Sequence, residues 1–279
     1  MRSGHAAGYS LPVVAAGVGV RRGNGWAVRS ASFRLGPPGL GPAPLAPPIL
    51  GIATFDAGHA RHAIGAGVPG SRWWAARQRA ADEVSHILTA VLAGRNTHSY
   101  GSLIVLGQDL SEPGGRAAVR LQVGLARGRG LTFPGVRIRG LVDQAAWRAR
   151  QLHRERYLLV AAILDRLALT AWAGVPLRAA PPLVARKARL AAAMVNQPRL
   201  LLLDGMLDDL GPADQIALGA VIRDLARDTS VIAAGRDAVA LRQASEHVLT
   251  LSEGILVGPP PPRLGGFLTG IPDEPAYFA

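Results

Sequence analysis

Hydrophobic and polar positions follow two different patterns along this chain, one typical of strands and one typical of helices. Residues 13–20 and 31–35 are short apolar runs on either side of the turn sequence RGNG at 22–25, which is a strong hairpin signal. Residues 73–92 instead show the three-to-four spacing of a helix with one apolar face. The positions on that face are Val84, Ile87, Leu88, Val91 and Leu92.

The second half of the chain alternates between the same two patterns. Residues 200–203 are four leucines followed by Asp204, which is typical of a central strand buried on both faces. Because strands and helices alternate, the sequence predicts an α/β fold with a parallel sheet and crossover helices. Further strands are expected at 49–55, 101–105, 231–234 and 248–251, and helices at 136–172, 185–195 and 216–226.

The N-terminal apolar run allows two interpretations. Arg2 and His5 precede the apolar residues 11–20, as in a signal peptide, but two arginines follow at once and no small-x-small cleavage motif leads into an obvious mature start. We therefore expect 13–20 to be the first strand. The longest purely apolar stretch, 158–164, is far shorter than the roughly 18–20 residues that a membrane span needs.

The composition of the chain excludes several kinds of functional site. The chain has 31 Lys and Arg against 19 Asp and Glu, a formal net charge of +12, and no cysteine. The absence of cysteine excludes disulfides, zinc–thiolate sites, iron–sulfur clusters and a thiol nucleophile. A basic excess is compatible with nucleic acid or an acidic membrane surface. Since the arginines are spread along the whole chain and aromatic residues are 5%, we expect a solvated basic surface and no nucleic-acid partner.

Several segments together resemble the ATP-binding cassette of ABC transporters. The resemblance covers roughly residues 13–258 and rests on the order and spacing of its parts. It implies a P-loop NTPase (RecA-like) cassette with a helical lobe at about 131–184, an insertion at about 36–78, and a separate Pro-rich tail at 259–279. The segments are LAG at 92–94, YGSLIVLGQDL at 100–110, GLTFPGV at 130–136, NQPRLLLLD at 196–204, LGP at 210–212, VIAAGRD at 231–237 and VLTLSEGILV at 248–257.

The residues that handle ATP in that family are largely missing. A phosphate loop needs glycines, a lysine and a Ser or Thr, yet the only lysine of this chain is Lys187. Alignment from residues 92–94 places RAADEVSHI, 79–87, at that loop; an alternative places it at 53–61. In the first alignment two acidic residues would repel phosphate, and Ser85 stands where the lysine is required.

Other positions also lack the residues that bind or hydrolyse ATP in that family. Gly205 takes the place of the glutamate that polarises water, Arg236 that of the H-loop histidine, and Arg127 that of the Q-loop glutamine. The signature position reads APPLV at 180–184, without the serine. What remains is a vestigial cofactor site with no catalytic residue, in which Asp204 alone keeps the Mg²⁺-side role. Its members are Asp204, Ser85, His86, Arg127 and Arg236.

The resemblance therefore implies a degenerate cassette, an enzyme fold that we expect to be catalytically inactive, with ATP and Mg²⁺ weakly bound at most. Its expected partners are a membrane-spanning transporter subunit and a second, active cassette. Its expected location is peripheral, on the cytoplasmic face of the membrane. Three alternatives stay open: an active ABC ATPase with an unorthodox site, a basic module that binds nucleic acid or a membrane surface on the same fold, and a relic without activity. The transported substrate does not follow from this chain.

Overall fold

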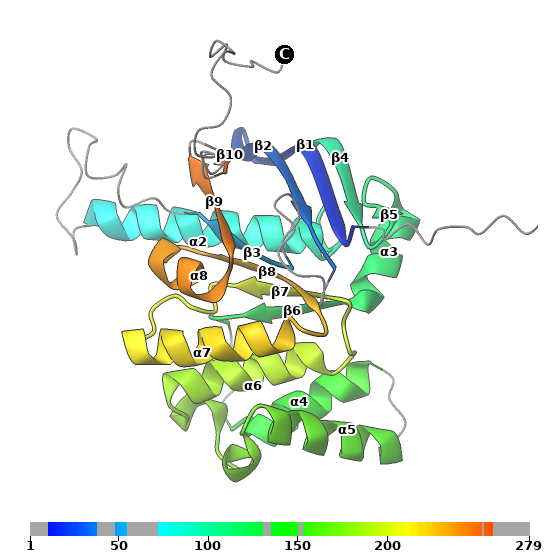
Figure 1. Cartoon of the computed structure of the whole chain (residues 1–279), viewed down its shortest axis with the longest axis vertical. Helices are drawn as coiled ribbons and strands as arrows, with labels where there is room; N and C mark the ends of the chain where they lie inside the picture. The colour runs from blue at the N-terminus through cyan, green and yellow to red at the C-terminus, as the bar shows by residue number, and fades with distance from the viewer. Residues whose placement is uncertain are drawn as a thin grey trace, which may run out of the picture.

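The structure is a computed structural model that describes residues 11–37, 48–54, 72–130, 135–149, 153–252 and 254–258. One ten-stranded sheet runs through it in the order β5-β4-β1-β2-β10-β9-β3-β8-β7-β6. One half of this sheet is antiparallel and the other is mostly parallel, and the long helix α2 crosses between them (Figure 1).

The antiparallel half begins with the predicted hairpin. Strands β1 (Val13–Arg22) and β2 (Gly25–Leu35) pair from Val13↔Leu35 to Arg22↔Gly25, so residues 13–20 form a strand as expected. Strand β4 (Tyr100–Val105) pairs with the other side of β1, and the short β5 (Gln108–Asp109) pairs with β4.

The parallel half contains the buried strands. Strands β6 (Val123–Arg127), β7 (Leu200–Asp204), β8 (Ser230–Gly235), β3 (Ile49–Ala53) and β9 (His247–Ser252) lie side by side and run in the same direction. Strand β10 (Ile255–Val257) turns back along β9 and joins this half to β2. The α/β fold with a parallel sheet is confirmed.

The leucines of β7 show how the sheet divides the interior. Leu201 and Leu203 belong to the apolar cluster that includes the helices α4 to α8, whereas Leu200 and Leu202 belong to the cluster that includes α2 and the hairpin. All four side chains are buried. Since neighbouring residues of a strand point to opposite faces, the run of leucines fills both cores at once.

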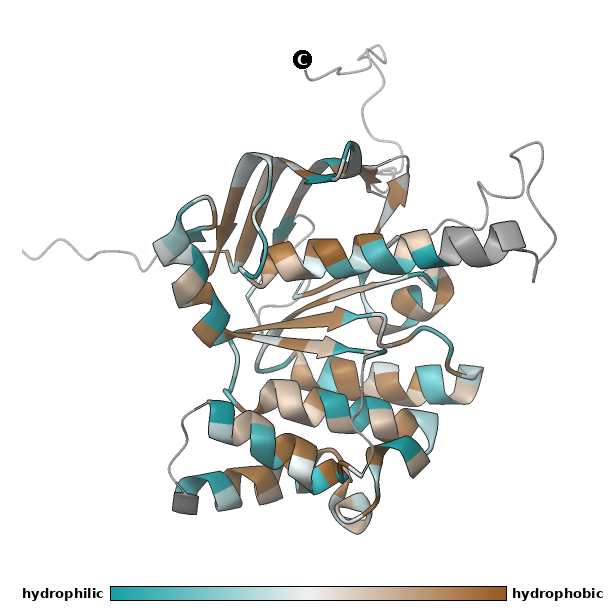
Figure 2. Ribbon diagram, turned by 180° about the vertical axis from the view of Figure 1, so that it is seen from behind, coloured by the Kyte–Doolittle hydropathy of each residue, from teal (hydrophilic) through white to brown (hydrophobic). Residues whose placement is uncertain are grey.

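The helices form layers on the two faces of the sheet. Helix α2 (Arg72–Leu92) lies on one face, with Leu88, Val91 and Leu92 buried. On the other face lie α6, α7 and α8, and α4 and α5 stack beyond them (Figures 1 and 2). Their bounds are α4 Ile138–Arg148, α5 His153–Arg166, α6 Pro182–Met194, α7 Pro212–Leu225 and α8 Ala238–Ala244.

Some elements differ from the prediction. The segment 136–172 is not one helix: α4 and α5 are separate, and short 3-10 turns follow at Thr170–Trp172 and Leu177–Ala179. The sequence patterns also miss α3 (Pro113–Gln122) and α8. Two parts of the segment 36–78 are elements of the fold, namely β3 and the first turns of α2.

The remainder of 36–78 and the tail at 259–279 lie mostly or wholly outside the described residues. Within the described ranges, none of the helices combines the length and the apolar character needed to cross a lipid bilayer.

Candidate functional site

The polar residues of interest gather where the parallel strands end. Strands β3, β6, β7 and β8 are parallel, so their carboxyl ends meet at one edge of the sheet. Arg127 is in register with Asp204, and Asp204 is in register with Ala234. In open α/β sheets this edge is the usual place for a ligand.

Helix α2 turns a polar stripe toward that edge. Asp82, Ser85, His86 and Thr89 are spaced by three or four residues, and therefore share one side of the helix. Ser85 and Thr89 are buried, and the Thr89 hydroxyl donates back to the Ser85 carbonyl at 2.9 Å. The stripe therefore brings Asp82, Ser85 and His86 to the strand ends, where they can form ion pairs or hydrogen bonds.

Residues 79–87 lie inside this helix and not in a loop. The alignment that places a phosphate loop there is therefore wrong in its local structure, because a helix interior has no free backbone N–H groups to offer a phosphate. Strand β3 ends at Ala53, the first residue of the alternative segment 53–61. Residues 55–61 lie outside the described residues.

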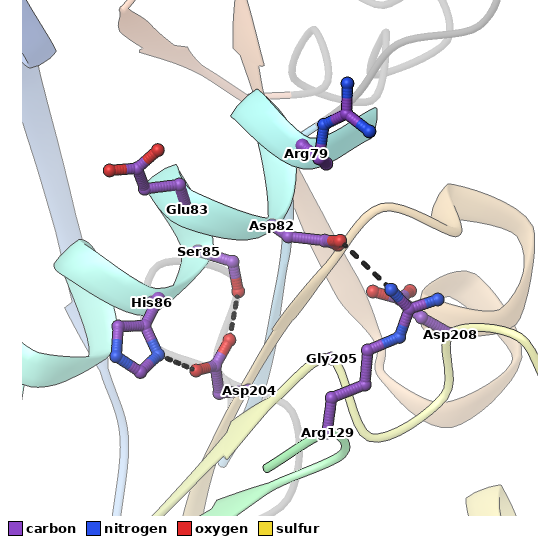
Figure 3. Close-up of a pocket in the computed structure, with 9 residues that line it drawn as sticks. All are labelled: Arg79, Asp82, Glu83, Ser85, His86, Arg129, Asp204, Gly205 and Asp208. Carbon is purple, nitrogen blue, oxygen red and sulfur yellow. Dashed lines mark hydrogen bonds and ion pairs between the residues drawn. The ribbon is translucent and has the colours of Figure 1, made fainter. Parts of the chain in front are cut away.

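Asp204 is held by three side chains from two elements, α2 and β6. Ser85 Oγ donates to its Oδ1 at 2.7 Å, and His86 Nδ1 lies 2.9 Å from its Oδ2. Since a carboxylate can only accept, the ring nitrogen is the donor. Arg127 Nε lies 3.7 Å from the same Oδ2. Asp204 is 8% exposed, so these contacts replace water around the carboxylate (Figure 3).

A second cluster of charges adjoins the first. Arg236 Nε lies 2.6 Å from Asp82 Oδ1, and its Nη2 lies 2.9 Å from Asp209 Oδ1. Asp208 accepts the backbone N–H groups of Arg236 at 3.0 Å and of Asp237 at 3.1 Å. Arg129 pairs with Asp209 and lies 3.6 Å from Asp82. This cluster ties α2 to the segments that follow β6, β7 and β8.

The pKa values of these carboxyl groups move in different directions. Burial raises the pKa of Asp208, against the two backbone N–H groups and Arg236, which lower it. Burial likewise raises the pKa of Asp82, although Arg236 and Arg129 oppose it. For Asp209 burial is outweighed by Arg236 and Arg129, so its pKa lies below the ordinary value. Two of the three acids are thus harder to ionise than in water.

The cavity between the two clusters holds about 310 Å³. Figure 3 shows Asp204 pointing at α2 and Arg129 reaching toward Asp82 on the far side. At the side toward the hairpin, Arg22 forms an ion pair with Glu83 of α2. Trp26 of the hairpin packs edge-on against Tyr100, with ring centroids 5.3 Å apart. Ion pairs and a hydrogen bond therefore link α2 both to the hairpin and to the segments at the strand ends.

The five residues of the expected site are thus placed in two groups. Ser85, His86 and Arg127 all contact Asp204. Arg236 belongs to the neighbouring cluster. Sequence reasoning missed that cluster's other members, although the consecutive acids after β7 and the polar stripe of α2 are visible signals. The missed members are Asp82, Arg129, Asp208 and Asp209.

These residues do not fit a magnesium–nucleotide complex. The single lysine of the chain lies on α6, and the acids Asp82 and Glu83 line the cavity beside Asp204, where they would repel phosphate. Both oxygens of Asp204 already have donors. In the described part of the chain, no three His, Asp or Glu side chains are grouped to hold a metal ion.

Two further positions have local structures that oppose the usual chemistry. Gly205 has φ +60° and its N–H donates to the Ala234 carbonyl at 2.8 Å, so a side chain at this position would be strained. At the signature position, Pro181 and Pro182 begin α6, and no side chain in the described part of the chain caps that helix. Because proline has no N–H, this helix start offers fewer donors to an anion.

Comparison with solved structures finds proteins that share this fold over most of their length. CbiO1 from Clostridium perfringens, part of the ABC transporter complex CbiONQ, is similar with a TM-score of 0.67 and 13% identity over 88% of this chain and 87% of that chain. The chain has the fold of an ABC-type ATP-binding cassette. A structure described as a metal-chelate type ABC transporter in an inward-facing conformation has a TM-score of 0.63 and 14% identity, over 90% of this chain and 83% of that chain.

The likeness is one of fold. No protein-family model matches the cassette's sequence, and no curated protein matches it either. The P-loop NTPase type of α/β architecture predicted from the sequence is confirmed by the two structures.

Proposed function

We propose that this cassette is a non-hydrolysing subunit of an ABC transporter, an architectural or regulatory partner of a second cassette that is active. The observation that carries the proposal is the occupation of Asp204 by Ser85 and His86 of its own helix α2. In a working cassette this carboxylate would have to face Mg²⁺. Here its hydrogen bonds are made within the chain.

The chemistry of hydrolysis is missing at the same edge. Gly205 supplies no general base, and a general base contributes about 10²–10⁴ in rate. Arg236, at the position of a catalytic histidine, is held by Asp82 and Asp209. We therefore expect this cassette to work without hydrolysing a nucleotide at its own site. The prolines at the signature position also remove N–H donors with which it could contact a nucleotide in a partner's site.

A groove on the helical lobe supports a membrane-subunit partner. It has a volume of about 670 Å³ and lies between the start of α4 and the side of α5. Tyr157 is 59% exposed there, and the Arg139 guanidinium stands 4.7 Å above its ring. An aromatic residue beside a cation suits an amphipathic helix with acidic side chains, such as a cytoplasmic helix of a transporter subunit. The location that follows is the cytoplasmic face of a membrane.

The charge distribution favours this function over nucleic-acid binding. Several arginines pair with acids of the same chain, among them Arg129, Arg166 and Arg236. These three do not add to a continuous basic stripe for a phosphate backbone, which such binding requires.

Thermal melts of the purified chain test the proposal. The chain and its Asp204→Ala variant are melted with and without millimolar Mg-ATP, beside a hydrolysing cassette as positive control. A bound ligand at 100 times its Kd adds about 2.7 kcal/mol, which is a shift of several degrees. We expect a shift for the positive control only. A shift of the wild-type chain that Asp204→Ala abolishes, with ATP turnover, would establish an active ATPase instead.

A further inference from the structure

A second cavity lies at the opposite edge of the parallel strands. It is lined by the last turns of α5, α6 and α7 and by residues that lead into β7 and β8. Arg199 directly precedes β7, and Thr229 directly precedes β8. This cavity is therefore at the amino ends of the strands, whereas the Asp204 cluster is at their carboxyl ends.

The walls of the cavity are mostly apolar. Its volume of about 410 Å³ falls within the range of about 300–1,000 Å³ that is usual for small-molecule sites. Leu167 and Leu225 form a buried floor, at 3% and 1% exposure. Such a surface suits the hydrocarbon part of a ligand. The apolar lining residues are Leu159, Ala162, Ile163, Leu167, Met194, Pro198 and Leu225.

The mouth carries a guanidinium that has no acidic partner among the described residues. Arg166 Nη2 lies 2.8 Å from Asp228 Oδ2 and 3.8 Å from Asp224 Oδ2, and Asp224 also pairs with Arg227 at 3.5 Å, so these two arginines and two acids balance one another. The exposed Arg199 donates only to the neutral amide of Gln122, at 3.3 Å, and takes part in no ion pair with a described residue. The carbonyl at the end of α7 is satisfied within the chain, because Leu225 O accepts the N–H groups of Asp228 and Thr229. The balance at the mouth therefore favours an anionic group.

We propose that this cavity binds a small amphipathic carboxylate, with its hydrocarbon chain against Leu167 and Leu225 and its carboxylate on Arg199. Guanidinium and carboxylate form strong, charge-assisted hydrogen bonds, and burial of each methylene adds to the affinity. The site shares no residue with the Asp204 clusters. It stands whether or not the cassette hydrolyses ATP.

Titration calorimetry of the full chain with sodium octanoate tests the site, with octylamine as a probe of the same length and opposite charge. We expect saturable binding of octanoate and at least about tenfold weaker binding of octylamine. Absence of octanoate binding at millimolar concentration would overturn the proposal. Equal affinity for both probes would overturn its anionic specificity.

Two variants and a control locate the binding. Ala162 lines the cavity and is exposed, so Ala162→Trp places an indole over the mouth, and we expect it to abolish octanoate binding. Arg199→Gln should weaken binding about tenfold. Arg223→Gln on α7, whose guanidinium donates to Gln243 O away from the cavity, should bind as the wild type does. Unchanged affinity in Ala162→Trp or in Arg199→Gln would place the ligand elsewhere. If Ala162→Trp does not fold, Arg199→Gln remains as the test, because Arg199 is exposed and its substitution should leave the fold intact.

Discussion

Ser85 Oγ donates a hydrogen bond to Asp204 Oδ1 at 2.7 Å and so joins two residues that are 119 positions apart in the chain. Ser85 is 1% exposed and Asp204 is 8% exposed. Both side chains are buried, and the bond fixes the middle of α2 to the end of β7.

Loss of this bond should destabilise the cassette. We expect Ser85→Ala to lower the free energy of unfolding by about 1–3 kcal/mol, because one oxygen of a buried carboxylate loses its donor. Urea denaturation followed by circular dichroism measures it. Thr170→Ala, on an exposed 3-10 turn, is the matched control and should change the free energy by less than about 0.5 kcal/mol. Equal effects of the two substitutions would contradict this role of Ser85.

Arg236 should contribute more to the free energy of unfolding than Arg22, an exposed arginine that also pairs with an acid on α2. Its side chain is 9% exposed and meets Asp82 and Asp209, so we expect Arg236→Ala to cost about 3 kcal/mol. The exposed pair of Arg22 with Glu83 should contribute at most about 1 kcal/mol. Double-mutant cycles of Arg236 with Asp82 and of Arg22 with Glu83 give the two coupling energies. A larger coupling in the second cycle would refute this ranking.

The free energy of unfolding should depend on pH in part through the titration of Asp208. Because burial raises its pKa in the folded state, the folded chain binds this proton more tightly than the unfolded chain does. The contribution of Asp208 to the free energy of unfolding therefore rises as the pH falls through the raised pKa, and levels off below the ordinary value of 3.8. Asp209, whose pKa is lowered, acts oppositely at still lower pH.

Urea denaturation at a series of pH values checks this. Asp208→Asn keeps an oxygen that can accept the backbone N–H groups of Arg236 and Asp237 and removes the titration. The difference between wild type and variant should shift in favour of the wild type on acidification from neutral pH. A difference that is constant with pH, or that moves the other way, would show that the raised pKa is not present.

Restoring a glutamate after Asp204 should not restore hydrolysis. Gly205 has φ +60°, a conformation that costs a side-chain-bearing residue about 1–2 kcal/mol, and a Cβ there would lie 3.3 Å from Asp208 Oδ2. We expect Gly205→Glu to lower the melting temperature and to show no phosphate release with Mg-ATP. Gly140→Ala, inside α4 with open space around an added Cβ, is the control and should melt at or above the wild-type temperature. Turnover in Gly205→Glu would mean that the rest of the site is competent.

Most of the strands and the long helix follow from sequence because their patterns are local, whereas β6 was not predicted. The four leucines of β7 and the apolar face of α2 each indicate their element without knowledge of the rest. Helix α3 escapes prediction because it begins Pro113-Gly114-Gly115, residues with low helix propensity, and its position depends on packing: a Cβ on Gly115 would lie 2.1 Å from Asp109 O.

The site was predictable only in part. Asp204 and Arg127 were expected in the site because of the resemblance to the cassette family, and the parallel pairing of β6 with β7 places the two residues in register. The partners of Arg236 do not follow, because Asp82 reaches it from α2 and that depends on how far the helix extends past the strand ends. The helix itself was predicted from its apolar face, but the alignment of residues 79–87 to a phosphate loop left the role of its polar face unrecognised. The spacing of Asp82, Ser85, His86 and Thr89 is the sequence signal that identifies its polar face.

The polar stripe of α2 belongs to the same chain as the strand ends that it contacts. A dissolved nucleotide would occupy those ends in proportion to its concentration, whereas a tethered helix is present at an effective concentration that the fold sets. Stability and shape at this edge should then be the same in ATP-rich and ATP-depleted surroundings. Within a pair of cassettes, such a subunit would be the half that does not respond to the energy state of the cell.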